Sequence, residues 1–376
     1  MGNSDWVIFW AVAGARFLLP LTIPRYPLPG IVASLLLDGI DQTLFQQFTS
    51  LPLDNYQGYD KALDIYYLTI AYITMLRNWH HLFAFKVGRF LFYWRLVGVA
   101  LFELSGLRPL LLIFPNTFEY FFIFYETCRL GWNPARISKK LLVGAAAFIW
   151  IVIKLPQEYW IHIAQMDTTD WIKMSLFGVP VDRPWGEIVR AWPGVFVAAF
   201  AVAALGLFGL WWLVSRRLPP CDRALTFAAD RHQPAFPAEQ VREAMAQEAS
   251  RIVDSALVEK VALGALVSIS FAHVLPEVRS TSLQLVLGVA CIVTINTMLT
   301  HWLARHGFGW TADLRRFLLM FAANAGLIWV YGLLRAWLDV AVRLENVLFF
   351  ALLLTLLLML YDRYRQIYLM RFRLSA

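Results

Sequence analysis

The residues with the clearest potential for chemistry are five aspartates in one short stretch of an otherwise apolar and basic chain. They are Asp38, Asp41, Asp54, Asp60 and Asp64. The first two share one face of a predicted helix, and that face continues through Gln42, Gln46 and Thr49. The last two are four residues apart, on one face of the next helix. Because such a polar stripe is costly against lipid, we expect it to border a hydrated cavity or another helix.

Two carboxylate pairs on adjacent helices offer oxygen ligands for a divalent cation, which can in turn hold a phosphate. The predicted metal-binding and catalytic residues are Asp38, Asp41, Asp60 and Asp64. The predicted cofactor is Mg²⁺ or Mn²⁺, and Gln42 and Gln46 are predicted to contact the substrate. The two pairs are expected at different depths, with Asp41 far below the outer end of its helix and Asp60 near the surface.

Ion pairing is the alternative explanation of the same aspartates. Asp38 or Asp41 would then neutralise Arg16 of the first predicted span. Asp60 and Asp64 would favour the start of their helix through its dipole. The sequence leaves both explanations open.

A second set of charges lies in the predicted hairpin of spans four and five. Counted from a bend near Gly106, Arg95 and Glu119 fall at nearly equal depth, so an ion pair between them is expected. Alternatively, Arg95 binds an anionic group of a substrate, or Glu119 relays a proton. A further match is expected nearer the inner end, between Glu126 and the bases Lys86 and Arg89. Pro115 is placed to kink the fifth span.

The composition predicts an all-α, polytopic transmembrane bundle. Of 376 residues, 59% are hydrophobic and 16% are charged, whereas a soluble domain carries about 25% charged residues. Several apolar runs approach the ~20 residues that cross a bilayer, and lipid forces such runs to be helical. About eleven spans are predicted, at 6–22, 29–49, 62–78, 84–104, 109–127, 141–155, 194–214, 258–276, 282–303, 316–337 and 345–362.

Loop charges predict the orientation of the chain. Basic residues collect in alternate loops, and the other loops are acidic or mixed. The positive-inside rule then places the N-terminus outside and the C-terminus in the cytoplasm, in the plasma membrane. The same rule accounts for the net charge of +7 without a nucleic-acid partner. Cys128, Cys221 and Cys291 show no metal-binding spacing, and no structural disulfide is expected.

The charges divide the chain into two halves. Residues 1–190 carry most of the ionisable groups at membrane depth and are the candidate functional half. Residues 191–376 are expected to be a scaffold of further spans. The polar residues expected to join its helices are His273, Asn296, His301 and Asn324. A cytoplasmic linker at 216–257 contains a predicted helix at 237–257, which either docks a cytoplasmic partner or runs directly into the eighth span.

The outer segment at 156–193 mixes aromatic, acidic and basic residues. It includes Trp160 and Trp171, so a helix lying in the membrane interface is expected. It forms either a lid over an outward cavity or an aromatic belt that anchors the protein in lipid headgroups. His162 could act as an acid or base near such a cavity.

Three functions are compatible with these features. The leading hypothesis is an enzyme, a transferase, that acts at the outer leaflet on a lipid-linked or phosphate-bearing amphiphile. The second is a proton- or cation-coupled transporter that uses Asp38, Asp41 and Glu119. The third is a non-catalytic membrane subunit with structural charges. Membrane lipid is the expected partner in each case, and the chain contains no P-loop, dinucleotide-binding or zinc-protease motif.

Overall fold

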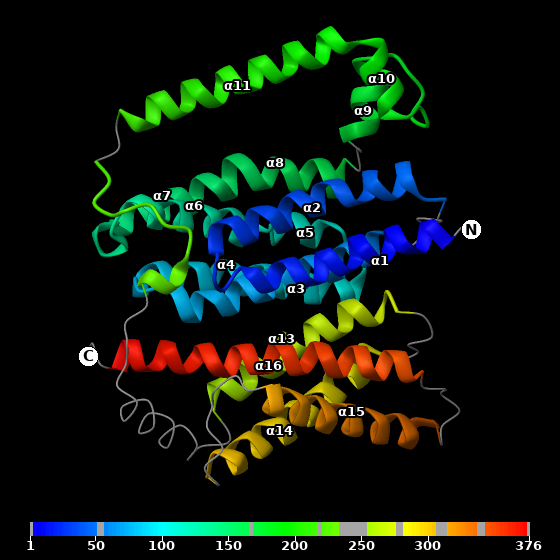
Figure 1. The fold of residues 1–376 in the computed structure, drawn as a ribbon, viewed down its shortest axis with the longest axis vertical. Helices are drawn as coiled ribbons and strands as arrows, with labels where there is room; N and C mark the ends of the chain where they lie inside the picture. The colour runs from blue at the N-terminus through cyan, green and yellow to red at the C-terminus, as the bar shows by residue number, and fades with distance from the viewer. Residues whose placement is uncertain are drawn as a thin grey trace.

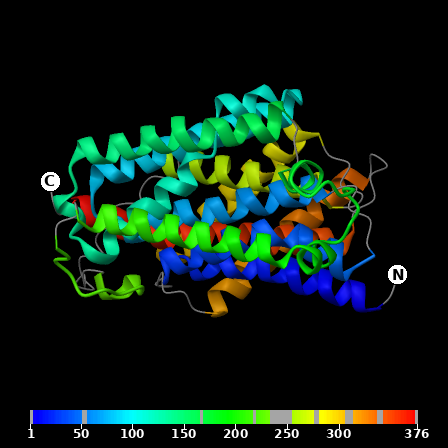
Figure 2. The same cartoon turned by 90° about the horizontal axis from the view of Figure 1, so that it is seen from above.

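The structure, a computed structural model, is a bundle of α-helices (Figure 1). It describes residues 3–50, 56–164, 168–216, 220–232, 254–275, 281–305, 314–336 and 343–373. These ranges contain no strand, which confirms the predicted all-α class. The N- and C-termini lie at opposite ends of the bundle in both views (Figure 1 and Figure 2).

The N-terminal part of the chain contributes the helices that carry the aspartates. They are α1 (Asn3–Leu18), the 3₁₀ turn η1 (Leu19–Thr22), α2 (Pro27–Phe48), α3 (Tyr56–Asn78), α4 (Leu82–Ser105), α5 (Pro109–Ile113) and α6 (Thr117–Gly131). Local sequence explains the ends of α4. The Nδ1 atom of His81 accepts a hydrogen bond from the Ala84 amide at 3.1 Å, and Gly106 ends the helix with a φ of 69°.

The next part of the chain forms a long, irregular helix and two short ones. The elements are η2 (Pro134–Arg136), α7 (Lys139–Phe148), the π-helical η3 (Ile149–Lys154), α8 (Leu155–Glu158), the π-helical η4 (Tyr159–Ile163), α9 (Thr168–Ser175) and α10 (Trp185–Ala191). The remaining elements are α11 (Pro193–Ser215), η5 (Ala229–His232), α13 (Ser255–Ala272), α14 (Ser282–Arg305), α15 (Leu314–Ala336) and α16 (Leu344–Arg373). The candidate span that begins at Lys139 continues to Ile163, so the first part of segment 156–193 belongs to that span. A separate short helix within this segment, α9, begins at Thr168.

Helix α3 lies at the centre of the bundle, where it packs against α1, α2, α4, α13 and α16. Its residues Tyr66, Tyr72 and Met75 are fully buried. Because protein surrounds it, α3 can carry polar and acidic residues that lipid would not tolerate. This explains why α3, although long enough to cross a membrane, is less apolar than a lipid-exposed span.

Within the described residues, seven helical segments are long and apolar enough to cross a membrane. They are Ser4–Thr22, Pro27–Phe48, Lys139–Ile163, Ser255–Ala272, Ser282–Trp302, Leu314–Leu333 and Leu344–Arg371. Each coincides with a predicted span, and together they are compatible with an integral membrane protein. An eighth follows if Trp185–Ala191 and Pro193–Gly209, which meet at 94°, form one broken span.

The other predicted spans depart from simple apolar helices. Helices α3 and α4 are long enough to cross a membrane, but their charged residues make them less apolar than the seven candidate spans. The fifth predicted span is interrupted, since α5 ends at Ile113 and α6 begins at Thr117. Pro115 lies in the gap, where its ring and its missing N–H prevent a continuous helix. Among the described residues, seven or eight of the predicted spans are therefore helices long and apolar enough to cross a membrane, and the count of about eleven is not confirmed.

Helix α11 differs from the others in its surroundings. It runs apart from the main bundle (Figure 1), and Val197, Phe200 and Leu205 are each about two-thirds exposed or more, at 69%, 77% and 69%. A helix that is apolar on all sides is typical of contact with lipid. This position is compatible with the membrane environment that the composition predicts.

The cytoplasmic linker is described only in part, and most of the predicted helix at 237–257 lies outside the described residues. The alternative prediction that this helix continues without a break into the eighth span is wrong. Asp254 is extended (φ −140°, ψ 178°) and caps α13 by accepting a hydrogen bond from the Leu257 amide at 2.9 Å. Segment 220–232 folds back onto the N-terminal helices, where the Asp222 amide donates to the Gly131 carbonyl at 3.0 Å, and Asp222 also pairs with Arg136 of η2 at 3.1 Å.

Helices α14, α15 and α16 are joined by buried amides and a hydroxyl. The Asn296 side chain donates to Asn324, and Asn324 donates to the Thr355 hydroxyl at 2.8 Å. These contacts agree with the predicted role of Asn296 and Asn324. However, this half also buries the charged residues Glu259 and Lys260 on α13, which the sequence prediction overlooked.

Candidate functional site

The four predicted aspartates converge on one arginine. Arg16 lies in the last turn of α1, and its side chain is 3% exposed. It donates hydrogen bonds to four carboxylates from two helices, those of Asp38 and Asp41 on α2 and of Asp60 and Asp64 on α3. The distances to Asp60 and Asp64 are 2.9 and 3.3 Å. The structure thus brings together all four residues that the sequence singled out.

The predicted difference in depth between the two aspartate pairs is wrong, because α3 begins earlier than expected. The helix begins at Tyr56, whereas the predicted span begins at residue 62. Asp64 therefore lies about 12 Å inside the outer end of α3, and Asp38 lies about 15 Å inside the outer end of α2. Antiparallel helices with these offsets place the two side chains at matching depth.

The four carboxylates occupy two different environments. Asp41 is fully buried, accepts hydrogen bonds from Arg16 and from the Tyr56 hydroxyl, and thus forms a closed ion pair. The side chains of Asp38, Asp60 and Asp64 are 21%, 32% and 28% exposed. The second group is reachable from outside the bundle, whereas the first is sealed.

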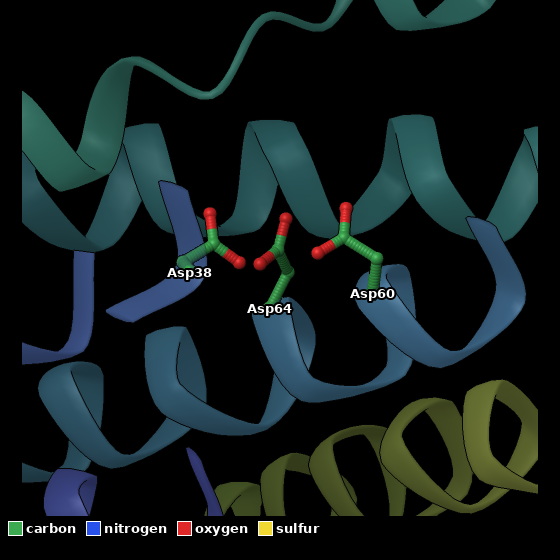
Figure 3. A group of neighbouring side chains, drawn as sticks. All are labelled: Asp38, Asp60 and Asp64. Carbon is green, nitrogen blue, oxygen red and sulfur yellow. The ribbon is translucent and has the colours of Figure 1, made fainter. Parts of the chain in front are cut away.

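The three accessible aspartates form a compact triad. Asp38, Asp60 and Asp64 each present a carboxylate oxygen, and the three oxygens lie within 4.8 Å of one another. Figure 3 shows the carboxylates turned toward each other from α2 and α3. Oxygen ligands at this spacing suit Mg²⁺, Mn²⁺ or Ca²⁺. The Asp38–Asp60–Asp64 triad is therefore the part of the cluster that could hold a cation.

The predicted substrate contacts on α2 lie away from the centre of the cluster. Gln42 is half-buried and Gln46 is exposed. Neither hydrogen-bonds to Arg16 or to the four carboxylates in the described residues. The predicted contact of Gln42 and Gln46 with a substrate stays a prediction. Asp54 lies outside the described residues.

Glu119 and Arg95 form a second network of buried charges, with pairings that differ from the prediction. Glu119 faces Lys154 at 3.8 Å and accepts hydrogen bonds from the Tyr67 hydroxyl at 2.5 Å and the Asn116 amide at 3.0 Å. Arg95 instead lies 3.8 Å from Glu158. The predicted Arg95–Glu119 pair is wrong because the break between α5 and α6 shifts Glu119 toward η3.

His162 and Asn116 complete this second network. Asn116 joins the two acids, since its backbone N–H donates to Glu158 at 3.0 Å. The Nε2 atom of His162 lies 2.9 Å from the other oxygen of Glu158. Tyr67, which donates to Glu119, lies one turn after Asp64 of the triad on α3. The two networks are thus neighbours within one charged region.

The inner end of the bundle contains an unpredicted cluster around Glu259. The hydroxyls of Tyr93 and Tyr361 each donate to its carboxylate at 2.5 Å, and Tyr72 donates as well. Arg89 lies 3.5 Å away, so its predicted partner Glu126 is wrong. Glu126 instead binds Arg129 at 2.7 Å and the Trp79 indole at 2.6 Å. The sequence could have indicated a buried charge here, because Glu259 and Lys260 stand together near the start of an apolar run.

Comparison with known proteins adds no assignment to these sites. No protein-family model, no curated protein and no solved structure matches the chain. The functional argument therefore depends on the charges and geometry of the described residues.

Proposed function

We propose that this chain is an integral membrane protein that binds a cation at the Asp38–Asp60–Asp64 triad and couples that binding to transport. One observation carries the proposal: the carboxylates around Arg16 bring more negative charge than its single positive charge can neutralise. Four carboxylates share one cation. With Asp41 paired to Arg16, three carboxylates remain without a full counter-charge from that arginine.

Such an excess is unfavourable unless something outside the chain neutralises it. Taking an unpaired charge out of water costs several kcal/mol even after the protein relaxes. The neighbouring Lys61 places its ammonium group over the Phe102 ring at 4.2 Å, and among the described residues the ion pairs of the four carboxylates are with Arg16. A bound cation or protons would remove the excess, and the 21–32% exposure of the triad allows them to exchange.

The electrostatics favour a cation over a phosphate as the first ligand. Arg16 is surrounded by carboxylates, and Arg95 is held by Glu158 and by the Phe114 carbonyl at 3.1 Å. Acidic side chains thus already face both guanidinium groups, which makes a phosphate a less favourable first ligand than a cation. A phosphate-bearing substrate would approach a negative region, whereas a cation would be attracted to it.

Cation binding can be measured with Mn²⁺, whose paramagnetism reports directly on its bound state. We expect purified protein in nanodiscs to bind Mn²⁺, and Asp60→Asn to weaken binding by at least about tenfold because a charged ligand is lost. Glu187→Gln is the matched control, since Glu187 is an exposed acid on α10 that pairs with Arg183. Equal Mn²⁺ affinity in wild type and Asp60→Asn would refute the proposed site.

Transport is tested separately from binding. Protein reconstituted in vesicles is given a gradient of pH or of a divalent cation, and ion movement is followed with fluorescent indicators. We expect flux that requires all three triad residues. Binding without flux under every gradient would remove the transport part of the proposal.

A metal-dependent enzyme is the second candidate function. The observation that favours it is the 4.8 Å grouping of three carboxylate oxygens, which also suits a metal that holds a phosphate. In this case the substrate would be a lipid-linked or phosphate-bearing amphiphile at the outer leaflet of the plasma membrane, with Gln42 and Gln46 near its path. Release of phosphate or headgroup from such lipids, dependent on Mn²⁺ and on Asp60, would favour the enzyme.

A further inference from the structure

Unpaired polar atoms gather where α5 ends and α6 begins. Among the described residues, the side-chain oxygens of Asn116 and Thr117 are buried without a hydrogen-bond partner, and so is the Nε atom of Arg95. Asn116 and Thr117 are 7% and 1% exposed. Arg95 is fixed at the same place, because its Nη1 atom donates to the Phe114 carbonyl. Buried polar atoms are costly to leave unpaired, so this combination points to bound water.

Ionisable side chains converge on this break from α6 and from the long irregular helix that contains η3, α8 and η4. Glu119 lies in the first turn of α6, Lys154 and Glu158 come from η3 and α8, and His162 comes from η4. Asn116 bridges the two acids, with a donor 3.0 Å from each. The break therefore places proton-binding groups beside sites for water.

The backbone around these groups is irregular at the same level. Pro115 interrupts the fifth predicted span, and Lys154 and His162 both lie in π-helical segments. Irregular backbone at membrane depth is tolerated where it is enclosed by protein or lines a hydrated cavity. Short π-helical segments occur frequently at functional sites. Both features agree with a polar site rather than a purely structural contact.

We propose that the α5–α6 break is a hydrated proton-transfer site in which Glu119 carries the proton. A proton moves from a hydronium ion onto the Glu119 carboxylate, and a later transfer returns it to water on the side of Glu158 and His162. Only O–H and N–H bonds form and break, so no oxidant or reductant is required. The inference rests on the proposed function, because it names the proton as the ion that moves with the cation.

The groups that face Glu119 define its setting. Tyr67 of α3 donates to one oxygen, Asn116 donates to the other, and Lys154 of η3 approaches at 3.8 Å. Lys154 in turn lies 4.0 Å from the centre of the Tyr120 ring. Tyr67 also connects Glu119 with the triad, since it lies one turn after Asp64 on α3. A cation that arrives at the triad would therefore change the electrostatic potential at the proton carrier.

Infrared difference spectroscopy tests the protonation of Glu119 without any transport assay. A protonated buried carboxyl group has a carbonyl band separate from that of a carboxylate. We expect a pH step applied to the protein in nanodiscs to produce absorption in this region, and Glu119→Gln to lower it by the contribution of one carboxyl group while the contribution of the triad remains. A band of unchanged intensity in Glu119→Gln would overturn the inference.

A flux measurement tests the role of the same residue in coupling. We expect Glu119→Gln to reduce cation-driven proton movement by at least about tenfold, with Mn²⁺ binding at the triad retained. The double variant Glu119→Gln with Lys154→Gln removes an acid and a base together and thus keeps the charge balance. Flux should remain low in this variant, and recovery to the wild-type rate would show that Glu119 is only a counter-ion.

The outcomes separate this inference from the proposed function. Absence of Mn²⁺ binding by the wild-type protein would refute the triad site but leave the infrared test of Glu119 intact. Binding at the triad combined with normal proton flux in Glu119→Gln would refute only the proton carrier. Size-exclusion profiles and thermal unfolding confirm that each variant is folded before it is compared.

Discussion

At the scale of single residues, Arg16 determines how the acidic cluster can exist inside the bundle. Its planar guanidinium group presents several N–H donors in fixed directions, which lets one side chain contact carboxylates on two helices. Asp41 and Tyr56 enclose one side of the group, and the triad remains on the more open side. The arginine thus organises the cluster, while the excess of acid leaves capacity for another cation.

Replacement of Arg16 should strongly destabilise the protein. Arg16→Met leaves buried carboxylates without their common counter-ion, and breaking a buried ion pair costs about 3–5 kcal/mol. Arg16→Lys should cost less, because the charge remains although the forked geometry is lost. Thermal unfolding of the protein in detergent measures both effects.

A surface arginine provides the control for this variant. Arg183 on the outer loop is 43% exposed and pairs with Glu187 at 3.2 Å. Exposed pairs of this type contribute about 0–1 kcal/mol, so Arg183→Met should leave the unfolding temperature almost unchanged. Equal effects of Arg16→Met and Arg183→Met would contradict the central role assigned to Arg16.

At the scale of helices, polar contacts rather than apolar surface alone determine which helices pack together. Lipid and leucine are equally apolar, so packing in a membrane depends on close fit and on hydrogen bonds between helices. The Asn296–Asn324–Thr355 chain connects α14, α15 and α16, and Glu259 connects α13 with α3, α4 and α16. Helix α11 shows the contrast, with exposed apolar side chains and few protein contacts.

The contribution of the asparagine pair can be measured by a double-mutant cycle. Asn296→Leu and Asn324→Leu each remove one partner of the same hydrogen bond, so their effects should not add. We expect a coupling energy of about 0.6–1.7 kcal/mol, as for other hydrogen bonds between membrane helices. Reversible unfolding in mixed detergent micelles gives the four free energies, and additive effects would show that the pair is not coupled.

At the scale of the whole molecule, the paths of the helices are consistent with termini on opposite sides of a membrane. The two ends of the chain lie at opposite ends of the bundle (Figure 1). Helices α9 and α10 lie at the end where α1 begins, whereas segment 220–232 lies at the end where α16 terminates (Figure 1). Which of these two ends faces the cytoplasm stays a prediction from the loop charges.

Site-directed labelling tests that orientation. In a variant without Cys128, Cys221 and Cys291, a new cysteine at Glu187 should react with a membrane-impermeant maleimide added to intact cells. A cysteine at Arg136 should react only after the membrane is permeabilised. Residues 187 and 136 are both exposed or partly exposed positions outside the long apolar helices, so access alone decides the result. The reverse pattern would refute the predicted topology.

Much of the fold was predictable because it depends on local composition. Apolar runs of sufficient length identified the seven candidate spans, and the polar face of residues 38–49 identified part of the acidic cluster. Prolines and glycines marked several helix ends, including the break at Pro115 and the end of α4 at Gly106. Each of these features depends on residues that are close in sequence, so a single chain was enough to infer them.

The pairing of charges was not predictable, because it depends on how helices from distant parts of the chain meet. Equal depth suggested that Arg95 pairs with Glu119. In the structure, which has a break before α6, Glu119 pairs with Lys154 and Arg95 pairs with Glu158. Lys154 lies in an apolar stretch, and nothing in the neighbouring sequence indicates that its partner is Glu119. Glu259 likewise depends on tyrosines more than a hundred residues away.

An apolar helical protein with an acidic cluster on its second and third predicted spans could be inferred from the order of residues alone. The packing of the helices was needed to see that Arg16 lies within that cluster, that Asp41 is sealed, and that Asp38, Asp60 and Asp64 remain accessible together. The reason is physical. Helix formation depends on neighbouring residues and the surrounding medium, whereas the environment of a buried charge depends on every helix packed around it.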